Sequence, residues 1–157
     1  MRRNRTGCSG CRDHSANRPA RHPQRSAQMA KDEMSEPLKT EVLVCVSCRA
    51  GQDVDADGVR PGARLFDALS HAPIAEGVTV RGVECLSNCD HGCSVAVRGG
   101  AARWTYVYGN FDADAHVDIL REGIAKYQAT DNGLVPWRER PEHFRKNCIA
   151  RIPPLET

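Results

Sequence analysis

Residues 83–97 read "VECLSNCDHGCSVAV", so Cys85, Cys89 and Cys93 recur every four residues between two valine-rich stretches. Apolar β-branched residues are typical of strands. The segment therefore predicts a loop that carries three thiols between two strands. Thiols this close together can form disulfides, fill a core, act as a redox pair or bind a metal. The rest of the chain is needed to choose between these interpretations.

A second pair of thiols lies at the end of another predicted strand. Residues 40–48 read "TEVLVCVSC", an apolar run without polar alternation that predicts a strand buried on both faces. The run ends in a CxxC motif formed by Cys45 and Cys48. A loop and a helix that begins at Pro61 follow, and residues 77–85 form the next predicted strand.

The predicted order of elements favours a small α/β fold. A strand, a crossover helix and a second strand favour parallel pairing with a right-handed connection. Beyond the cysteine loop, "CSVAVRG" and "RWTYVYG" predict a hairpin that turns at Gly99-Gly100. Residues 112–128 predict a helix whose first turn is acidic, which suits the helix dipole. We therefore expect an α/β sandwich, a small mixed sheet covered by helices.

The charge distribution separates the N-terminal segment from the rest. Residues 1–40 hold nine Lys/Arg and four Asp/Glu, whereas residues 41–127 hold eight and twelve. Residues 1–38 contain little to bury and predict a disordered basic tail. The tail has no aromatic side chain for base stacking, so we expect no nucleic-acid binding. Its CxxC motif, Cys8 to Cys11, stands in a segment without predicted structure, and we expect no metal site there.

The chain of 157 residues suits one domain, which we place at residues 39–130. Residues 131–157 contain several prolines and little regular structure apart from a short helix at 140–147. We expect this segment to be an extended strap packed on the domain through Trp137, Phe144 and Ile149, and Cys148 to be a buried small apolar group.

The two cysteine pairs are expected to meet. If the two strands are parallel neighbours, their carboxyl ends lie at the same edge of the sheet, which brings together Cys45, Cys48, Cys85 and Cys89. Four thiolates suit Zn²⁺ or an iron–sulfur cluster. A thioredoxin-type redox pair would need a helix that starts directly after the CxxC motif, and here a dozen residues precede Pro61. Buried packing of all these thiols is the remaining alternative.

Other candidate sites are weaker. "DVDADG", residues 53–58, opens like a calcium loop, but its twelfth position is Arg64 where a bidentate Glu is needed, so a solvated acidic loop is expected. His91 is either a ligand, a hydrogen-bond donor near the thiols or an exposed loop residue. No Gly-rich phosphate loop and no nucleophile with an orienting base are present, so we expect no enzyme.

The cysteines also bear on the compartment. Eight cysteines suggest disulfides in a secreted protein and metal or thiol chemistry in a cytosolic one. Residues 1–30 contain no apolar run of the kind found in secretory signals, and no stretch is long enough to cross a bilayer. We therefore expect a cytoplasmic protein that does not contact a membrane.

Residues 84–111, "ECLSNCDHGCSVAVRGGAARWTYVYGNF", resemble the second half of thioredoxin-like [2Fe-2S] ferredoxins and of the corresponding small subunit of respiratory NADH dehydrogenase. The resemblance implies a thioredoxin-like fold and a [2Fe-2S] cluster on Cys45, Cys48, Cys85 and Cys89. This chain differs in the closer spacing of its first pair and in Cys93, which replaces a proline. Cys93 is either a fifth metal ligand, a thiol that transfers a metal, or a packed residue.

Residues 41–155 also resemble a bacterial family of predicted metal-binding proteins, domain of unknown function 1636. The matching segments include "LVCVSCR", "RPGARLFDAL", "PWRERPE" and "ARIPPLE". Members are similar to the ferredoxins in fold and are associated with cobalamin-synthesis genes.

Two functions follow from the residues and the resemblances. The first is a [2Fe-2S] electron carrier that serves a redox partner. The alternative is a four-cysteine zinc protein with a structural or metal-trafficking role, linked to cobalamin metabolism and to a metal-handling partner. CxxC is the more usual spacing for zinc.

Overall fold

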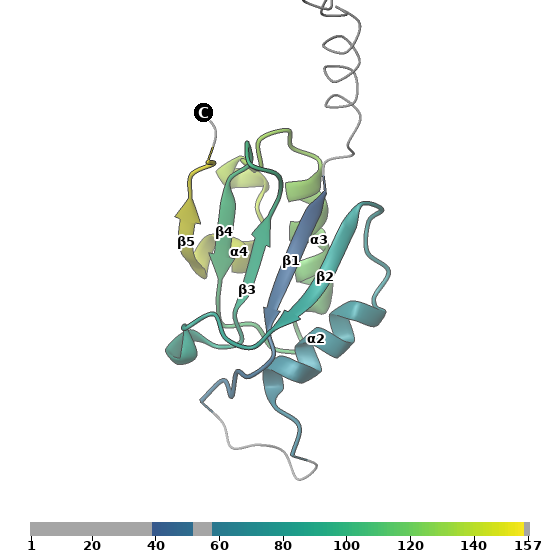
Figure 1. Ribbon diagram of the computed structural model, residues 1–157, viewed down its shortest axis with the longest axis vertical. Helices are drawn as coiled ribbons and strands as arrows, with labels where there is room; N and C mark the ends of the chain where they lie inside the picture. Colours follow the sequence, from purple (N-terminus) through teal and green to yellow (C-terminus); the bar gives the residue numbers. More distant parts are fainter. Residues whose placement is uncertain (1–38, 52–57, 156–157) are drawn as a thin grey trace, which may run out of the picture. The chain divides into compact units, whose positions relative to one another are not determined.

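The computed structural model describes residues 39–51 and 58–155, which form a five-stranded sheet with strand order β2-β1-β3-β4-β5 (Figure 1). The predicted basic tail with Cys8 and Cys11, and most of the predicted acidic loop at 53–58, lie outside the described residues. The strands are β1 (Thr40–Cys45), β2 (Val78–Val83), β3 (Val95–Arg98), β4 (Thr105–Tyr108) and β5 (Cys148–Ile152). The helices are α2 (Pro61–His71), α3 (Val117–Gln128) and α4 (Glu142–Lys146).

The strand pairing confirms the predicted α/β class with a mixed sheet. β1 and β2 are parallel, with Thr40 opposite Val78 and Cys45 opposite Val83. The other pairs, β1 with β3, β3 with β4 and β4 with β5, are antiparallel. Helix α2 connects β1 to β2, which is the crossover that a parallel pair requires. The carboxyl ends of β1 and β2 therefore lie at one edge of the sheet.

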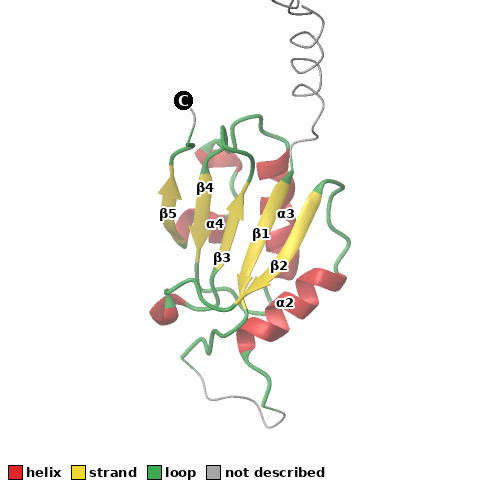
Figure 2. Ribbon diagram, in the orientation of Figure 1, coloured by secondary structure: helices red, strands yellow, loops and turns green. Residues whose placement is uncertain are grey.

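All three helices lie on one face of the sheet, behind it in the view of Figure 2. Every second strand residue points to this face, and α2 and α3 contribute leucines and an isoleucine. None of the helices in the described part of the chain is long and apolar enough to span a bilayer. The fully buried core residues of these elements are Val42, Val44, Leu65, Leu69, Val95, Val97, Tyr106, Leu120 and Ile124.

The opposite face of β1 is only partly covered, since Glu41 and Leu43 are half-buried, so the prediction that this strand is buried on both faces is wrong. Glu41 points to this face and accepts hydrogen bonds from Arg81 at 2.7 Å and from Arg98 at 2.6 Å. The hydrogen bond from Arg81, with that from Arg98, lowers the pKa of the Glu41 carboxyl. An apolar run has the same pattern whether one or both faces of the strand are covered. The polar residue Glu41 lies before the run and therefore does not interrupt it.

The helix predicted at 112–128 begins later, at Val117. The reason is local, because the Asp112 carboxylate accepts the backbone N–H groups of Asp114 and Ala115, both at 2.9 Å. This side-chain turn competes with helical hydrogen bonding. The backbone hydrogen bonds also lower the pKa of Asp112. Asp112 and Asp114 therefore precede the helix, and Asp118 is the acidic residue of its first turn.

The C-terminal segment contains more regular structure than an extended strap. The predicted short helix is α4, and β5 adds an edge strand that the sequence pattern does not predict. Phe144 is buried as expected, but Trp137 is 59% and Ile149 43% exposed, so the prediction that these two pack on the domain is wrong. Phe144 is therefore the buried residue of α4.

Candidate cysteine site at the carboxyl edge of the sheet

The two predicted cysteine pairs lie at the carboxyl ends of the two parallel strands, at the lower end of β1 and β2 in Figure 1. Cys45 is the last residue of β1, and Cys85 follows β2 by two residues. Backbone pairing continues past the strands, because Val46 N–H bonds Val83 O at 2.9 Å and Ser47 N–H bonds Glu84 O at 3.3 Å. This pairing holds the two cysteine loops side by side.

The thiols are neighbours, and they differ in exposure. Cys45 and Cys48 are 5% and 4% exposed, whereas Cys85 and Cys89 are exposed. The Cys85 sulfur interacts with the sulfurs of both Cys45 and Cys89. Every cysteine in the described residues is a free thiol. The site thus combines a buried pair on one loop with an exposed pair on the other.

Backbone N–H groups point at two of the sulfurs. Ala50 N–H donates to Cys48 Sγ at 3.4 Å, and Ser87 N–H donates to Cys85 Sγ at 3.2 Å. The Ser87 backbone hydrogen bond, aided by the Ser87 hydroxyl, lowers the pKa of the Cys85 thiol. The proximity of Cys85 raises the pKa of Cys89. Hydrogen bonds of this type stabilise thiolate ligands in metal and cluster sites.

In this structure the four thiols do not surround a common point at which one metal ion could bind. In the part of the chain that the structure describes, no three Cys, His, Asp or Glu side chains are gathered tightly enough to ligate one ion. The thiols of the two loops nevertheless interact with one another. The donor chemistry is four free thiols, two of which accept backbone N–H···S bonds, and it fits a thiophilic metal or an iron–sulfur cluster.

Three glycines let backbone approach the cysteine loops closely. A Cβ on Gly62 would lie 2.1 Å from Cys45 O, one on Gly92 would lie 2.0 Å from Cys48 Sγ, and one on Gly109 would lie 2.5 Å from His91 O. Each distance is far below van der Waals contact. None of the three has a positive φ, so the requirement for glycine is space and not backbone conformation.

We expect Gly92→Ala to displace the Cys48 sulfur, because the new methyl group would overlap it. The predicted result is a loss of at least about 10-fold in affinity for any metal that the thiols bind, as when a supporting group of a metal site is removed. Competition with a chromophoric chelator measures this affinity. Gly100→Ala is the control, because a Cβ at Gly100 meets no atom within 4 Å. Gly58→Ala is unsuitable, because the φ of +72° at Gly58 would strain an alanine. Equal affinities for Gly92→Ala and Gly100→Ala would contradict the prediction.

The amino end of α2 packs on the Cys45–Cys48 turn, although about a dozen residues separate them in sequence. Gly62 N–H donates to Cys48 O at 3.1 Å, and the Arg60 guanidinium donates to Ser47 O at 2.9 Å. The helix does not start directly after the CxxC motif in the sequence, as expected, but the fold brings its amino end back to the turn. The positive end of the α2 dipole faces the turn and favours negative charge on it.

Cys93 lies beside the buried pair and has no solvent-accessible surface. Its backbone forms two hydrogen bonds with Phe111, N–H to O at 3.2 Å and O to N–H at 3.1 Å. Its thiol interacts with that of Cys48, and burial raises the pKa of Cys93 to about 12. Complete burial favours the packed interpretation over a thiol that transfers a metal, since transfer needs access.

The remaining candidate residues lie at the margin of the site or away from it. His91 is exposed, and its backbone carbonyl accepts the N–H of Asn110 at 2.7 Å. Cys148 is half-buried on β5, with its thiol directed to Ala150 O at 3.7 Å. The sequence pattern gives no sign of the supporting role of Gly62, because it depends on a contact between distant segments.

Two histidines pack beside the segment that supports Cys93. The rings of His116 and His143 lie 4.3 Å apart, and His143 lies 4.5 Å from the ring of Phe111. His143 Nε2 donates to Gly109 O at 3.0 Å, since a carbonyl can only accept. Burial lowers the pKa of His143, and the neighbouring His116 acts in the same direction. The folded protein therefore favours a neutral His143.

A lowered histidine pKa makes stability depend on pH. Below about pH 6.5, the unperturbed value, the unfolded chain takes up a proton more readily than the folded one. The free energy of unfolding should therefore fall as the pH drops below 6.5 and level off below the folded-state pKa. Urea unfolding at pH 7.5 and 5.5 measures the difference, which His143→Gln should reduce. His71→Gln, at an exposed position, should leave it unchanged.

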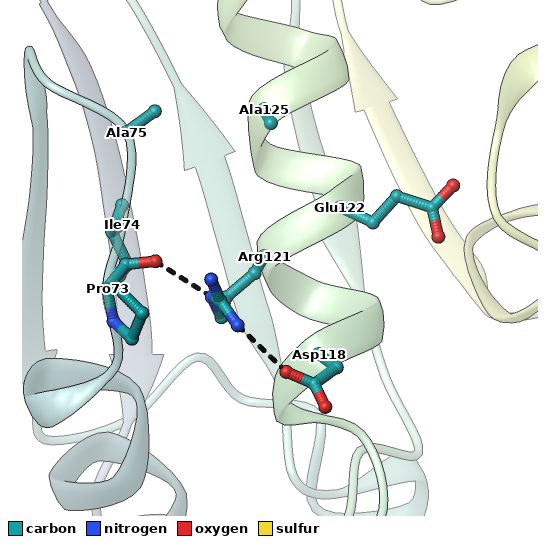
Figure 3. Close-up of a pocket in the computed structure, with 7 residues that line it drawn as sticks. All are labelled: Pro73, Ile74, Ala75, Asp118, Arg121, Glu122 and Ala125. Carbon is teal, nitrogen blue, oxygen red and sulfur yellow. Dashed lines mark hydrogen bonds and ion pairs between the residues drawn. The ribbon is translucent and has the colours of Figure 1, made fainter.

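A groove of about 360 Å³ lies between α3 and the connection from α2 to β2 (Figure 3). Its polar side chains are satisfied within the protein. Arg121 donates to Pro73 O at 2.8 Å and to Asp118 at 2.9 Å, and Glu122 pairs with Lys126 at 2.7 Å. The charged side chains of the groove are thus paired with other protein groups, and the cysteine edge remains the candidate site.

The fold and the site define a small α/β protein with a cysteine-rich sheet edge, and comparison identifies its family. Residues 42–154 match the family described as "protein of unknown function (DUF1636)", and the chain belongs to it. This match confirms the second resemblance found in the sequence. No curated protein matches the chain.

A solved structure similar to this chain is a thioredoxin-like [2Fe-2S] ferredoxin from Aquifex aeolicus. The sequences are 19% identical, and the match covers 76% of this chain and 98% of the ferredoxin, with a TM-score of 0.46. A likeness at this level carries no argument about the cysteines. The case for a function therefore depends on the site itself.

Proposed function

We propose that this protein is a [2Fe-2S] electron carrier whose cluster is held by Cys45, Cys48, Cys85 and Cys89. The observation that carries the proposal is the meeting of two free cysteine pairs, one from the end of each parallel strand. Iron–sulfur clusters of this kind take four thiolates, with one pair on each iron. When bound, the cluster supplies a one-electron redox couple.

The chain's own groups support such a role in three ways. Ala50 and Ser87 direct N–H groups at ligand sulfurs, which stabilises the thiolates. The amino end of α2 packs on the turn that carries the first pair and holds it in place. The exposed second pair, Cys85 and Cys89, leaves one side of the site open to a redox partner. The proposed role is therefore electron transfer and not catalysis. We place the protein in the cytoplasm, with a protein as its redox partner, and we propose that it binds neither nucleic acid nor a membrane.

A zinc site is the second candidate, and the CxxC spacing favours it. Two cysteines separated by two residues commonly ligate Zn²⁺ in closed four-cysteine sites. The same four residues would hold the ion, and the role would be structural or in metal trafficking, with a metal-handling partner and a link to cobalamin metabolism.

Anaerobic purification followed by absorption spectroscopy and elemental analysis tests both candidates on one sample. Visible absorption with about two irons per chain supports the cluster. A colourless protein with one zinc supports the second candidate and overturns the first. Absence of both metals after reconstitution overturns the site itself.

Serine variants assign the ligands. Cys45→Ser, Cys48→Ser, Cys85→Ser and Cys89→Ser should each lose most of the bound metal. Cys148→Ser is the matched control, because Cys148 lies on β5 away from the cluster of thiols. Cys93→Ser should retain the metal if Cys93 is packed and lose it if Cys93 is a ligand. Retention of metal by the first four variants would contradict the assignment.

A further inference from the structure

Three residues other than glycine have a positive φ in the described part of the chain, and all three contact the cysteine loops. They are Ala50 with a φ of +50°, Ser87 with +53° and Asn110 with +56°. An L side chain is strained in this left-handed region, so the surrounding fold must hold each residue there. Strained backbone of this kind is concentrated at functional sites. The shared location of these residues therefore indicates a role at the cysteine edge.

Two of the three residues direct a backbone N–H at a cysteine sulfur, and both do so from the same position. Ala50 is two residues after Cys48, and its N–H donates to Cys48 Sγ at 3.4 Å. Ser87 is two residues after Cys85, and its N–H donates to Cys85 Sγ at 3.2 Å. Each cysteine pair thus contains one sulfur that accepts a hydrogen bond from a left-handed residue.

The third residue has the same backbone conformation without a bond to sulfur. The N–H of Asn110 donates to His91 O at 2.7 Å. Asn110 therefore separates the effect of strain at this edge from the effect of an N–H···S bond.

We propose that Ala50 and Ser87 are positioning residues that raise the reduction potential of the metal group held by the four cysteines, an inference that rests on the proposed function. Reduction adds negative charge to a cluster and its ligand sulfurs. An N–H directed at a sulfur carries partial positive charge, so it stabilises the reduced state more than the oxidised one. The left-handed backbone is part of the device, because a residue forced to a negative φ must shift either its N–H or the loop beyond it.

The test measures the reduction potential of the full chain after anaerobic reconstitution with ferrous iron and sulfide. Ala50→Val and Ser87→Thr introduce β-branched side chains, which rarely adopt a positive φ, and Ser87→Thr keeps the hydroxyl. We expect each to lower the equilibrium constant for reduction about 10-fold, which is about 59 mV for a one-electron couple. Ala50→Gly accepts the left-handed backbone and keeps the N–H, so its equilibrium constant should stay within about twofold of the wild-type value.

Asn110→Val is the matched control, because it introduces the same strain at a residue whose N–H bonds an oxygen. It should lower the thermal stability of the metal-free protein and leave the equilibrium constant for reduction within about twofold of the wild-type value.

An amide-to-ester replacement at Ala50 removes the N–H and keeps the side chain. It should lower the equilibrium constant as Ala50→Val does, and it decides the result where a strained variant takes up no cluster.

The outcomes distinguish the two proposals. A wild-type protein that takes up a cluster, with an unchanged potential in the ester protein or in both strained variants, overturns the role of Ala50 and Ser87 alone. An equal fall in Asn110→Val overturns it as well, since strain would then be the cause. A wild-type protein that takes up no cluster overturns the proposed function and this role together. A 10-fold fall that Ala50→Gly and Asn110→Val do not share supports the inference.

Discussion

Gly62→Ala is expected to destabilise the protein and weaken the cysteine site at once. An alanine in a helix ordinarily stabilises it relative to glycine, by up to about 1 kcal/mol. Here the added Cβ would lie 2.1 Å from the backbone oxygen of Cys45 and 3.0 Å from Cys48 Cβ. Backbone cannot rotate away, so α2 must move off the CxxC turn. Overpacking of this kind costs on the order of 1–3 kcal/mol.

Chemical denaturation of the metal-free protein measures the change in the free energy of unfolding. Gly100→Ala is the matched control, because a Cβ there meets nothing within 4 Å. Its effect should stay within about 0.5 kcal/mol. A stabilised Gly62→Ala protein would show that α2 does not pack on the turn as described.

Phe144→Ala should give the larger loss of stability. Phe144 is 3% exposed, and its ring lies 4.3 Å from that of Tyr108 and 5.9 Å from that of Phe111. Gly123 on α3 makes room for it, since a Cβ there would lie 2.2 Å from the ring. Truncation leaves a cavity between α3, α4 and the sheet, at a cost of about 3–5 kcal/mol.

Trp137→Ala tests the same segment at an exposed aromatic residue. Trp137 stacks loosely with Arg140, with the guanidinium 5.9 Å from the ring centroid. Its removal should cost less than about 1 kcal/mol, the value of an exposed cation–π contact. Urea unfolding of both variants makes the comparison. Equal losses would mean that Trp137 anchors the segment, as the sequence pattern predicts and the structure contradicts.

The part of the fold that sequence predicts well is the part dictated by short-range patterns. Apolar runs locate β1 and β2, and Pro61 marks the start of α2. Parallel pairing follows from the order of these elements, so the meeting of the two cysteine pairs is predictable as well. The Gly99-Gly100 turn likewise locates the hairpin of β3 and β4.

The features that sequence does not predict depend on contacts between distant residues. β5 is a short edge strand with exposed residues. Its sequence is typical of a loop, and only its pairing with β4 shows that it is a strand. The start of α3 is an exception, because it depends on a local turn in which the Asp112 carboxylate accepts the backbone N–H groups of nearby residues. The contact of Gly62 with the CxxC turn requires the intervening loop to fold back, and neither spacing nor composition indicates this.

The unequal exposure of the two cysteine pairs has a kinetic consequence. A chelator, an oxidant or an acceptor protein can reach the exposed Cys85 and Cys89 directly, whereas Cys45 and Cys48 are buried. An ion held by all four thiols would therefore leave in a fixed order, first from the solvent-facing sulfurs and last from the covered ones. Thiol-directed reagents should follow the same order. In the metal-free protein, alkylation of Cys85 and Cys89 should be faster than alkylation of Cys45 and Cys48.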